Sequence, residues 1–485
     1  MLIKTICNKI HYRVMLVSLF LQVGCTNSEL SRKPNIIFIL ADDLGWRDLG
    51  FMGSEFYETP NLDKLASESM VFTNAYAASP ICSPSRAAIL SGKHPARLHL
   101  TDWIPGNPPS RTEKLMAKPF KTELAMEEFT LAEAMQQGGY KTFFAGKWHL
   151  GEEAFYPEYH GFDINIGGNH TGHPSSYFSP YNNPQLPDGP DGEYLTDRLV
   201  NETISFMKEE QGNPFLAFLS FYSVHLPLQG KPEKVEKYRK KLQNMNFNGK
   251  ELVQQGTTYF KNHQNDPVYA AMVESMDENI GRLLKAIKQL GLDKNTIIVF
   301  TSDNGGMATN RNPNPIPTSN LPLRAGKGHL YEGGIREPLI VCWPGRVVPG
   351  SRSDEPVTGT DFYPTFIDLA GIKMLPEQHI DGNSLKPALF SKERIDRQAI
   401  FWHYPHYSGG LGGRPAAAVR MGKYKLIAFF EDMEVELYDL ETDISEQHDL
   451  STKMPKKVKE MKGLLHAWRK EVGAQMPIPN PDYKE

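Results

Sequence analysis

Cysteine is scarce in this sequence, with four residues among 485. One of them, Cys7, lies in an N-terminal segment that we expect to be removed from the mature chain. The other three are Cys25, Cys82 and Cys342, and the first two stand in motifs that predict other uses for their side chains. We therefore expect no structural disulfide bond, and the hydrophobic core must hold the fold together.

The sequence also lacks a large excess of charge, internal repeats and low-complexity tracts. It carries 53 basic and 57 acidic residues, for a net charge of −4. This balance argues against nucleic acid and against a polybasic membrane surface as partners, so an anionic substrate needs a local basic pocket. A chain of 485 residues is long enough for one large α/β domain and a smaller one.

No apolar run is long enough to span a membrane. The apolar residues 14–23 follow three basic residues and predict a signal peptide over residues 1–24, with a buried apolar helix as the alternative. Gly24 and Cys25 resemble a bacterial lipoprotein cleavage site, although Gln22 departs from the usual aliphatic residue. We expect an exported protein that is periplasmic or tethered to the outer membrane of a Gram-negative bacterium through a lipid on Cys25.

Four apolar, β-branched runs predict strands buried in a mainly parallel sheet, at residues 34–41, 140–145, 214–221 and 296–301. Polar segments follow them, namely Asp42-Asp43, Lys147-Trp148-His149, Ser223-Val224-His225 and Asp303-Asn304. Ligand sites in such sheets lie at the carboxyl ends of strands, so we expect these side chains at one edge. Adjacent carboxylates repel each other and favour a bound cation, although a solvated turn explains Asp42-Asp43 taken alone.

A second feature is the segment Cys82-Ser83-Pro84-Ser85-Arg86, followed by small and apolar residues. It predicts a loop that enters a helix with Cys82 at its start. The free N–H groups of a helix N-terminus, together with Arg86 one turn later, form a pocket for a tetrahedral anion. A buried cysteine in a proline-containing turn is the alternative, because short motifs match by chance.

These residues resemble the signature of the type I sulfatases, and the likeness continues through Leu90, Ser91, Gly92 and Arg97. Further segments resemble motifs of the same family, namely Asp42 with residues 43–45, residues 146–151, residues 302–306, and Lys327 before residues 331–334. The resemblance implies the alkaline-phosphatase-like α/β fold of bacterial carbohydrate sulfatases and arylsulfatases. That fold has a large mixed, mostly parallel sheet sandwiched by helices, here over residues 33–393, and a smaller C-terminal antiparallel sheet with a helix, over residues 394–485.

The resemblance also implies the activity, a sulfuric ester hydrolase acting on sulfate monoesters. In this family the signature cysteine, here Cys82, is converted to formylglycine (3-oxoalanine) by a formylglycine-generating or anaerobic sulfatase-maturating enzyme. The resemblance assigns one Ca²⁺ per chain to Asp42, Asp43, Asp303, Asn304 and the diol derived from Cys82. Such an all-oxygen set suits a hard cation better than zinc.

The resemblance assigns catalysis to Cys82, Arg86, Lys147, His149, His225 and Lys327. In the implied mechanism one hydroxyl of the hydrated aldehyde attacks sulfur, with Asp303 as a candidate base. The lysines and the arginine hold the sulfuryl oxygens as charge shifts in the transition state. His225, helped by Lys327, protonates the leaving oxygen, and His149 accepts the proton whose loss expels sulfate and restores the aldehyde.

The substrate is expected to be a sulfated polysaccharide fragment, such as carrageenan or a glycosaminoglycan, with a galactose or N-acetylgalactosamine sulfate as the specific expectation. The candidate substrate-binding residues are Asp102, Trp103, His170, His173, His403 and His406. Residues 161–190 have the composition of a long loop, where substrate selection often lies, but histidines in such loops are often surface residues. Core packing is the alternative for His403 and His406.

Two other functions remain open. The first is a phosphatase or phosphodiesterase on the same scaffold, which would normally show a Thr or Ser nucleophile and a histidine-rich zinc site. The second is a non-catalytic, glycan-binding surface lipoprotein, in which Cys82 would keep its thiol.

Overall fold

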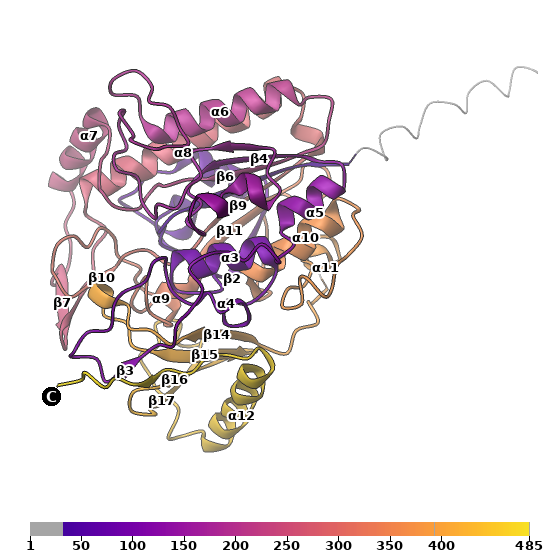
Figure 1. Cartoon of the computed structure of the whole chain (residues 1–485). Coiled ribbons are helices and arrows are strands. Elements are labelled where there is room, and N and C mark those ends of the chain that lie inside the picture. Colours follow the sequence, from indigo (N-terminus) through magenta and orange to yellow (C-terminus); the bar gives the residue numbers. More distant parts are fainter. Residues whose placement is uncertain (1–32, 392, 485) are drawn as a thin grey trace, which may run out of the picture.

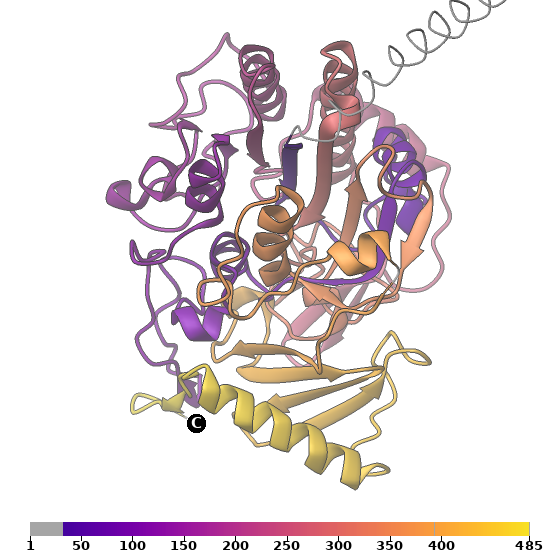
Figure 2. The same cartoon turned by 90° about the vertical axis from the view of Figure 1, so that its right-hand side faces the viewer.

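The computed structural model describes residues 33–391 and 393–484. A large sheet lies between two layers of helices, and a smaller sheet with helix α12 (Pro455–Glu471) forms one end of the molecule (Figures 1 and 2). The predicted signal peptide and the lipidation of Cys25 fall outside the described residues and stay predictions. Within the described part of the chain, no helix is long and apolar enough to cross a membrane.

The large sheet has nine strands, with four parallel neighbours at its centre. Its strands are β1 (Asn35–Ala41), β2 (Met70–Tyr76), β4 (Lys141–Gly146), β5 (Ile164–Ile166), β6 (Phe215–Ser220), β9 (Thr296–Ser302), β11 (Arg336–Cys342), β12 (Ser351–Ser353) and β13 (Val357–Thr358). Their order is β12-β2-β11-β9-β1-β6-β4-β5, and β13 also pairs with β2. Strand β11 runs antiparallel to β9 and β2, so the sheet is mixed, and the predicted α/β fold is confirmed.

The two faces of the sheet are covered because its central strand β1 is apolar on both sides. Ile37 and Ile39 pack with residues of α2 (Pro60–Ser67), α6 (Leu195–Glu209), α7 (Pro232–Gln243) and α8 (Pro267–Gln289). Phe38 and Leu40 pack with residues of α3 (Cys82–Ser91), α5 (Leu131–Gln137), α10 (Phe362–Leu369) and α11 (Lys386–Phe390). Successive side chains of a strand point to opposite faces, so one apolar run supplies both cores.

The smaller sheet is antiparallel, in the order β14-β15-β16-β17. Its strands are β14 (Ile400–Tyr404), β15 (Ala416–Met421), β16 (Tyr424–Phe429) and β17 (Val435–Asp439). Trp402 and Ala418 face the large domain and share a core with Cys82, whereas Val419 and Leu426 face α12. The domain boundary at residue 393 stays a prediction, and the first strand of this sheet begins at Ile400.

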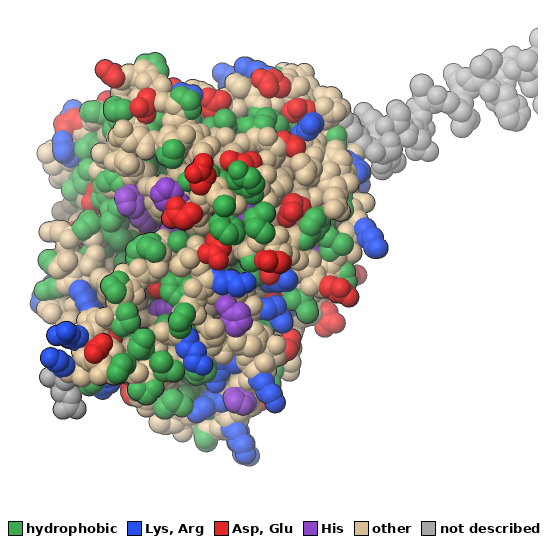
Figure 3. All heavy atoms as spheres, viewed as in Figure 1, with side chains coloured by type: hydrophobic (Ala, Val, Ile, Leu, Met, Phe, Trp, Pro, Cys, Tyr) green, Lys and Arg blue, Asp and Glu red, His purple; other side chains and the backbone are tan. Residues whose placement is uncertain are grey.

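Several short elements were not expected. The charged stretch 231–261 contains α7 and then the hairpin of β7 (Leu252–Gln255) and β8 (Thr258–Lys261), in which β8 also pairs with β10 (Thr309–Asn310). Strand β3 (Leu115–Met116) pairs with β18 (Ile478–Pro479), and two short helices are α4 (Pro95–Leu98) and α9 (Glu332–Ile335). On the face seen in Figure 3, charges of both signs are interspersed with apolar side chains, as the balanced composition predicts.

Candidate active site

The polar segments that follow β1, β4, β6 and β9 meet at one edge of the large sheet. These strands are consecutive neighbours and run parallel, so their carboxyl ends lie side by side. The backbone N–H of Asp43 donates a hydrogen bond to Asp303 Oδ1 at 3.2 Å, and the N–H of Asp42 donates to the Ser223 carbonyl at 2.9 Å. The sequence-based expectation that these segments converge is therefore correct.

Three carboxylates form the centre of this edge. One oxygen from each of Asp42, Asp43 and Asp303 lies within 4.8 Å of the others, and all three residues are buried. Asn304 Nδ2 donates to Asp43 Oδ1 at 2.8 Å, while the buried Asn304 Oδ1 has no hydrogen-bond partner in the described part of the chain. A buried amide oxygen without a partner is costly, and an oxygen ligand set of this kind fits a hard cation such as Ca²⁺.

Three cationic side chains surround the carboxylates. Lys147 Nζ donates to both oxygens of Asp42 at 2.9 and 2.8 Å, and Lys327 Nζ donates to Asp43 Oδ2 at 2.7 Å. Arg86 Nε donates to Asp303 Oδ2 at 2.9 Å, and Arg86 Nη2 lies 2.8 Å from the same oxygen in an ion pair. The chain has no excess of basic residues overall. These three side chains therefore supply the local positive charge that an anionic substrate needs.

Burial and the neighbouring charges shift the pKa values of the adjacent carboxyls Asp42 and Asp43 in opposite directions. Burial raises the pKa of Asp42 to about 8, because the attraction of Lys147 is offset by the repulsion of Asp303 and Asp43. Burial acts in the same direction on Asp43, but Lys327, His225 and Lys147 outweigh it and hold its pKa below the usual value. A divalent cation between these groups would favour the ionised form of both.

Cys82 begins α3, as predicted, and lies beside this cluster. Its Sγ is 3.6 Å from His149 Nδ1, and its side chain is 3% exposed. Burial raises the pKa of the thiol despite the nearby Lys147 and Lys327. A raised pKa disfavours the thiolate, which is the reactive form of cysteine. The geometry therefore suits a side chain that reacts in another chemical form better than it suits a cysteine nucleophile.

Two histidines complete the site, His149 beside Cys82 and His225 beside Asp43. His149 Nε2 lies 2.6 Å from the Ile104 carbonyl oxygen, and His225 Nδ1 lies 2.9 Å from the Leu226 carbonyl oxygen. A carbonyl oxygen only accepts, so these nitrogens carry the protons in the neutral rings. His149 Nδ1 then faces Cys82 as an acceptor, and His225 Nε2, 3.5 Å from Asp43 Oδ2, faces the cluster.

Both histidines are neutral at pH 7 before substrate binds. Burial and the charge of Lys147 lower the pKa of His149 well below its ordinary value. Burial and the charge of Lys327 do the same to the pKa of His225, although Asp43 opposes them. A bound anion would raise both pKa values, because it stabilises the protonated ring.

The predicted substrate-binding residues divide into three groups. Trp103 is half-buried and packs in the same cluster as Cys82, and the exposed ring of His173 lies parallel to the His225 ring, with centroids 6.1 Å apart. Asp102 and His406 are buried, with Asp102 Oδ2 3.5 Å from His406 Nδ1, and the latter ring is also bonded to Thr101. They form a layer behind Trp103, not a surface open to a sugar.

The remaining two histidines make their hydrogen bonds outside the acidic cluster, and their assignment to substrate binding stays a prediction. His403 is 3% exposed on the α12 side of β14, and its Nε2 is bonded to the Gln475 carbonyl at 2.9 Å. The alternation of a strand explains this position, since Trp402 on one side faces the large domain. His170 is exposed and bonded through Nδ1 to the Tyr156 hydroxyl at 2.8 Å.

Two residues without a predicted role support the site. Ser220 Oγ lies 2.7 Å from Arg86 Nη1 and 2.7 Å from the Lys147 carbonyl, so it positions both cations. A Cβ added to Gly172 would lie 2.6 Å from His149 Cε1, so the loop backbone packs directly on this ring. Ser220 is the last residue of an apolar strand, and no sequence pattern marks it as functional.

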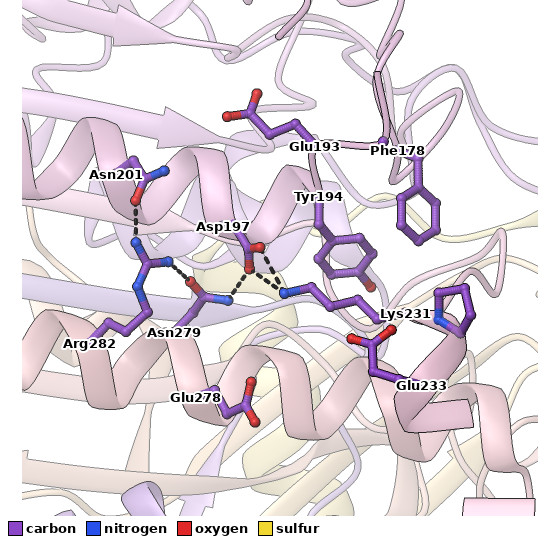
Figure 4. A pocket seen from close by; sticks show the side chains of 12 residues that line it. Phe178, Glu193, Tyr194, Asp197, Asn201, Lys231, Glu233, Glu278, Asn279 and Arg282 are labelled. Carbon is purple, nitrogen blue, oxygen red and sulfur yellow. Dashed lines mark hydrogen bonds and ion pairs between the residues drawn. The ribbon is translucent and has the colours of Figure 1, made fainter. Parts of the chain in front are cut away.

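A separate hollow of about 610 Å³ lies between α6, α8 and the start of α7 (Figure 4). Five of its polar side chains are bonded to one another: Lys231 Nζ and Asn279 Nδ2 both donate to Asp197, and Arg282 donates to Asn279 and Asn201. It shares no residue with the acidic cluster. We interpret this hollow as a cross-link between helices and do not include it in the site.

Comparison with known proteins agrees with this geometry. A family model described as Sulfatase matches residues 34–372, and one described as N-sulphoglucosamine sulphohydrolase, C-terminal, matches residues 325–471. A sulfatase of Formosa agariphila is 30% identical over 537 aligned positions, which cover 94% of this chain and 92% of that protein. The N-acetylgalactosamine-6-sulfatase of Mus musculus is 31% identical over 429 positions, covering 83% and 73%. The solved structure of Ps i-CgsB in complex with k-i-k-neocarrahexaose has a TM-score of 0.73 at 30% identity and covers 90% of this chain and 93% of that chain.

Proposed function

This chain belongs to the sulfatase family, and from that premise we propose that it hydrolyses sulfate monoesters of carbohydrates with a bound Ca²⁺ and a formylglycine made from Cys82. The net reaction takes a sulfate ester and water to the free alcohol, sulfate and a proton. One observation supports it above the others. Three buried carboxylates, three cationic side chains and the side chain of residue 82 meet at one edge of the sheet.

Two groups of the proposed site, the Ca²⁺ and the formylglycine, are not encoded directly in the sequence, and each has its own role. Asp42, Asp43, Asp303 and Asn304 would hold the Ca²⁺, which would supply positive charge to stabilise negative charge on the sulfuryl oxygens. Conversion of Cys82 to formylglycine supplies a hydrated aldehyde as the nucleophile. The raised pKa of the unmodified thiol supports the need for this conversion.

The cations of the chain bind and orient the sulfate group. Lys147 and Lys327 each have three N–H donors, so both can donate to a sulfuryl oxygen while they keep their bonds to Asp42 and Asp43. Arg86 is held by Asp303, Ser220 and the Lys147 carbonyl. Donors that are fixed in place before the reaction stabilise the transition state without reorganisation, and each contributes about 10²–10³ in kcat.

The two histidines move protons at different positions of the site. His149 Nδ1 accepts a proton from the group at position 82, while its Nε2–H stays on the Ile104 carbonyl. His225 Nε2 faces the cluster and donates a proton to the leaving oxygen after the charge of the bound ester has raised its pKa. The base therefore contacts residue 82, whereas the acid lies beside Asp43.

The proposed substrate follows from the relatives. The mouse relative is an N-acetylgalactosamine-6-sulfatase, and the Ps i-CgsB structure holds a neocarrahexaose. We extend these names to a galactose or N-acetylgalactosamine sulfate within a polysaccharide fragment. The maturation enzyme is then a required partner of the exported chain.

The test uses the full chain produced together with a formylglycine-generating enzyme. The mass of the peptide that contains residue 82 reports the conversion, and kcat/KM is compared for the sulfate and phosphate esters of one nitrophenol. Preference for the sulfate ester by the converted protein supports the proposal. A higher kcat/KM for the phosphate ester would favour a phosphatase, and protein from its native host that carries only the thiol would favour a glycan-binding role. A panel of defined sulfated saccharides then identifies the sugar.

A further inference from the structure

A second hollow, of about 590 Å³, opens beside His225. Its walls are residues 173–175, residues 225–228 and Pro315. We call it the proline-lined pocket, because Pro174, Pro227 and Pro315 contribute to it together with two leucines. No Asp, Glu, Lys or Arg is among these residues, so the pocket contrasts sharply with the charged cluster next to it.

The two sites share His225. Its ring lines the pocket, while its Nε2 lies 3.5 Å from Asp43 Oδ2, the same oxygen that Lys327 binds. A general acid must lie within hydrogen-bond distance of the leaving oxygen. When the leaving oxygen lies within hydrogen-bond distance of His225, the carbon bonded to it is also next to His225. The rest of the alcohol then lies at the proline-lined pocket, because His225 is part of the pocket wall.

The walls of the pocket are held in place by hydrogen bonds between the two loops. The Tyr177 hydroxyl donates to the carbonyls of Tyr222 and His225, at 2.5 and 2.9 Å. Gln229 Oε1 accepts from the Tyr177 backbone N–H at 2.7 Å and from Ser176 Oγ at 3.3 Å. These bonds tie the loop that carries His173 to the segment that carries His225, so the pocket exists before a ligand arrives.

We propose that the proline-lined pocket binds the alcohol half of the sulfate ester and selects an alcohol that carries no charge next to the scissile bond. The apolar face of a sugar or aryl ring gains free energy against proline and leucine side chains. A carboxylate or a second sulfate at this position loses water and finds no Lys or Arg in the lining of the pocket. This inference rests on the proposed function, and it excludes uronates and doubly sulfated sugars at this subsite.

A matched pair of esters tests the inference, 3-carbamoylphenyl sulfate and 3-carboxyphenyl sulfate, which differ in charge but little in size. We expect the converted protein to have a kcat/KM at least about tenfold higher for the neutral ester, mostly through KM. Leu228→Lys should reduce or reverse this ratio, and Leu228→Glu should increase it. Leu228→Met keeps the apolar character and the approximate volume, so it should leave the ratio unchanged.

Two further measurements separate binding from folding and turnover. The unconverted protein keeps the Cys82 thiol, so calorimetry with it measures the Kd of each ester without hydrolysis, and the same preference is expected. Pro315→Lys places a cation on the exposed rim, where it does not threaten the core, and it should shift the ratio in the same direction as Leu228→Lys.

The outcomes distinguish the two proposals. If the converted protein hydrolyses both esters equally, or if the charged variants leave the ratio of kcat/KM unchanged, the pocket assignment is overturned while the sulfatase activity stands. If the converted protein hydrolyses neither these esters nor nitrophenyl sulfate, the proposed function fails and the pocket assignment falls with it.

Discussion

Replacing Lys425 with methionine should loosen the attachment of the C-terminal sheet to the large domain. Lys425 lies on β16 with no exposed surface, and its Nζ donates to Glu332 Oε1 at 2.9 Å and to Glu446 Oε1 at 2.8 Å. Glu332 begins α9 in the large domain, and its backbone N–H donates to Glu446 Oε2 at 2.6 Å. One buried cation therefore joins two carboxylates across the interface.

The size of the loss follows from what remains after the substitution. Removing one partner of a buried ion pair costs about 3–5 kcal/mol, because the other partner keeps its charge without compensation. Glu332 retains Arg336, whose Nη1 lies 3.0 Å away. Burial raises the pKa of Glu446 to about 7 even though Lys425 attracts its charge, so this carboxyl can take up a proton in the variant. We therefore expect Lys425→Met to lower the free energy of unfolding by about 3 kcal/mol, near the lower limit of this range.

The loss should depend on pH in a defined direction. The folded-state pKa of Glu446, about 7, is above the ordinary value of 4.5 for a glutamate, so its contribution to stability is complete below about pH 4.5 and is lost as the pH rises through about 7. Without Lys425 the folded-state pKa rises further. The difference in unfolding free energy between the wild type and Lys425→Met should therefore be smaller at pH 5 than at pH 8.

Urea unfolding followed by circular dichroism at these two pH values measures both effects. Lys423→Met is the matched control, because this lysine is 37% exposed and its pair with Asp439 should contribute less than about 1 kcal/mol. A second substitution, Glu446→Gln, in the Lys425→Met background should recover part of the loss. Equal losses for Lys425→Met and Lys423→Met, or a difference that does not grow with pH, would refute the reasoning.

Three other predictions concern the active site. Chelation of divalent cations should lower the Tm, and added Ca²⁺ should restore it. At a Ca²⁺ concentration of a hundred times Kd, the free energy of unfolding should rise by about 2.7 kcal/mol. Asp303→Asn should abolish this response, and a Tm that does not change with Ca²⁺ would contradict the metal site. His225→Ala should reduce kcat by about 10²-fold or more for sugar sulfates but much less for nitrophenyl sulfate, whose leaving group needs no proton; equal losses would exclude His225 as the acid. His403→Gln should change kcat/KM less than about twofold, since its ring is buried against the C-terminal segment, and a larger fall would place it near the substrate.

The sequence predicted the central strands well because their signal is local. Residues 36–41 are uniformly apolar, and so short an apolar run between polar segments is typical of a strand buried on both faces. The helix at 130–137 was also predictable, since Thr130 and Glu133 form a capping box that the structure contains. The hairpin at 252–261 was missed, because its residues are mostly polar and its pairing with β10 is remote in sequence.

The candidate site was predictable to the extent that its residues stand in short motifs. Three of these residues follow predicted strands, namely Asp42, Lys147 and Asp303, and Cys82 begins a predicted helix. The parallel arrangement of the strands brings the strand ends together. The substrate-binding residues were predicted less well, because a histidine among aromatic residues has no local signature that separates a surface position from a core position. The burial of His403 favours core packing, the alternative that the sequence left open.

The sequence by itself determined which side chains are available for the chemistry and at which strand ends they stand, since both depend on neighbours within a few residues. Only the tertiary structure decided that Ser220 positions Arg86, that Asn304 Oδ1 has no hydrogen-bond partner among the described residues, and that a pocket without Asp, Glu, Lys or Arg lies beside His225. These features depend on distances between segments that lie tens to hundreds of residues apart along the chain. Such distances are set by packing of the whole sheet and its two helical layers, which no single stretch of sequence encodes.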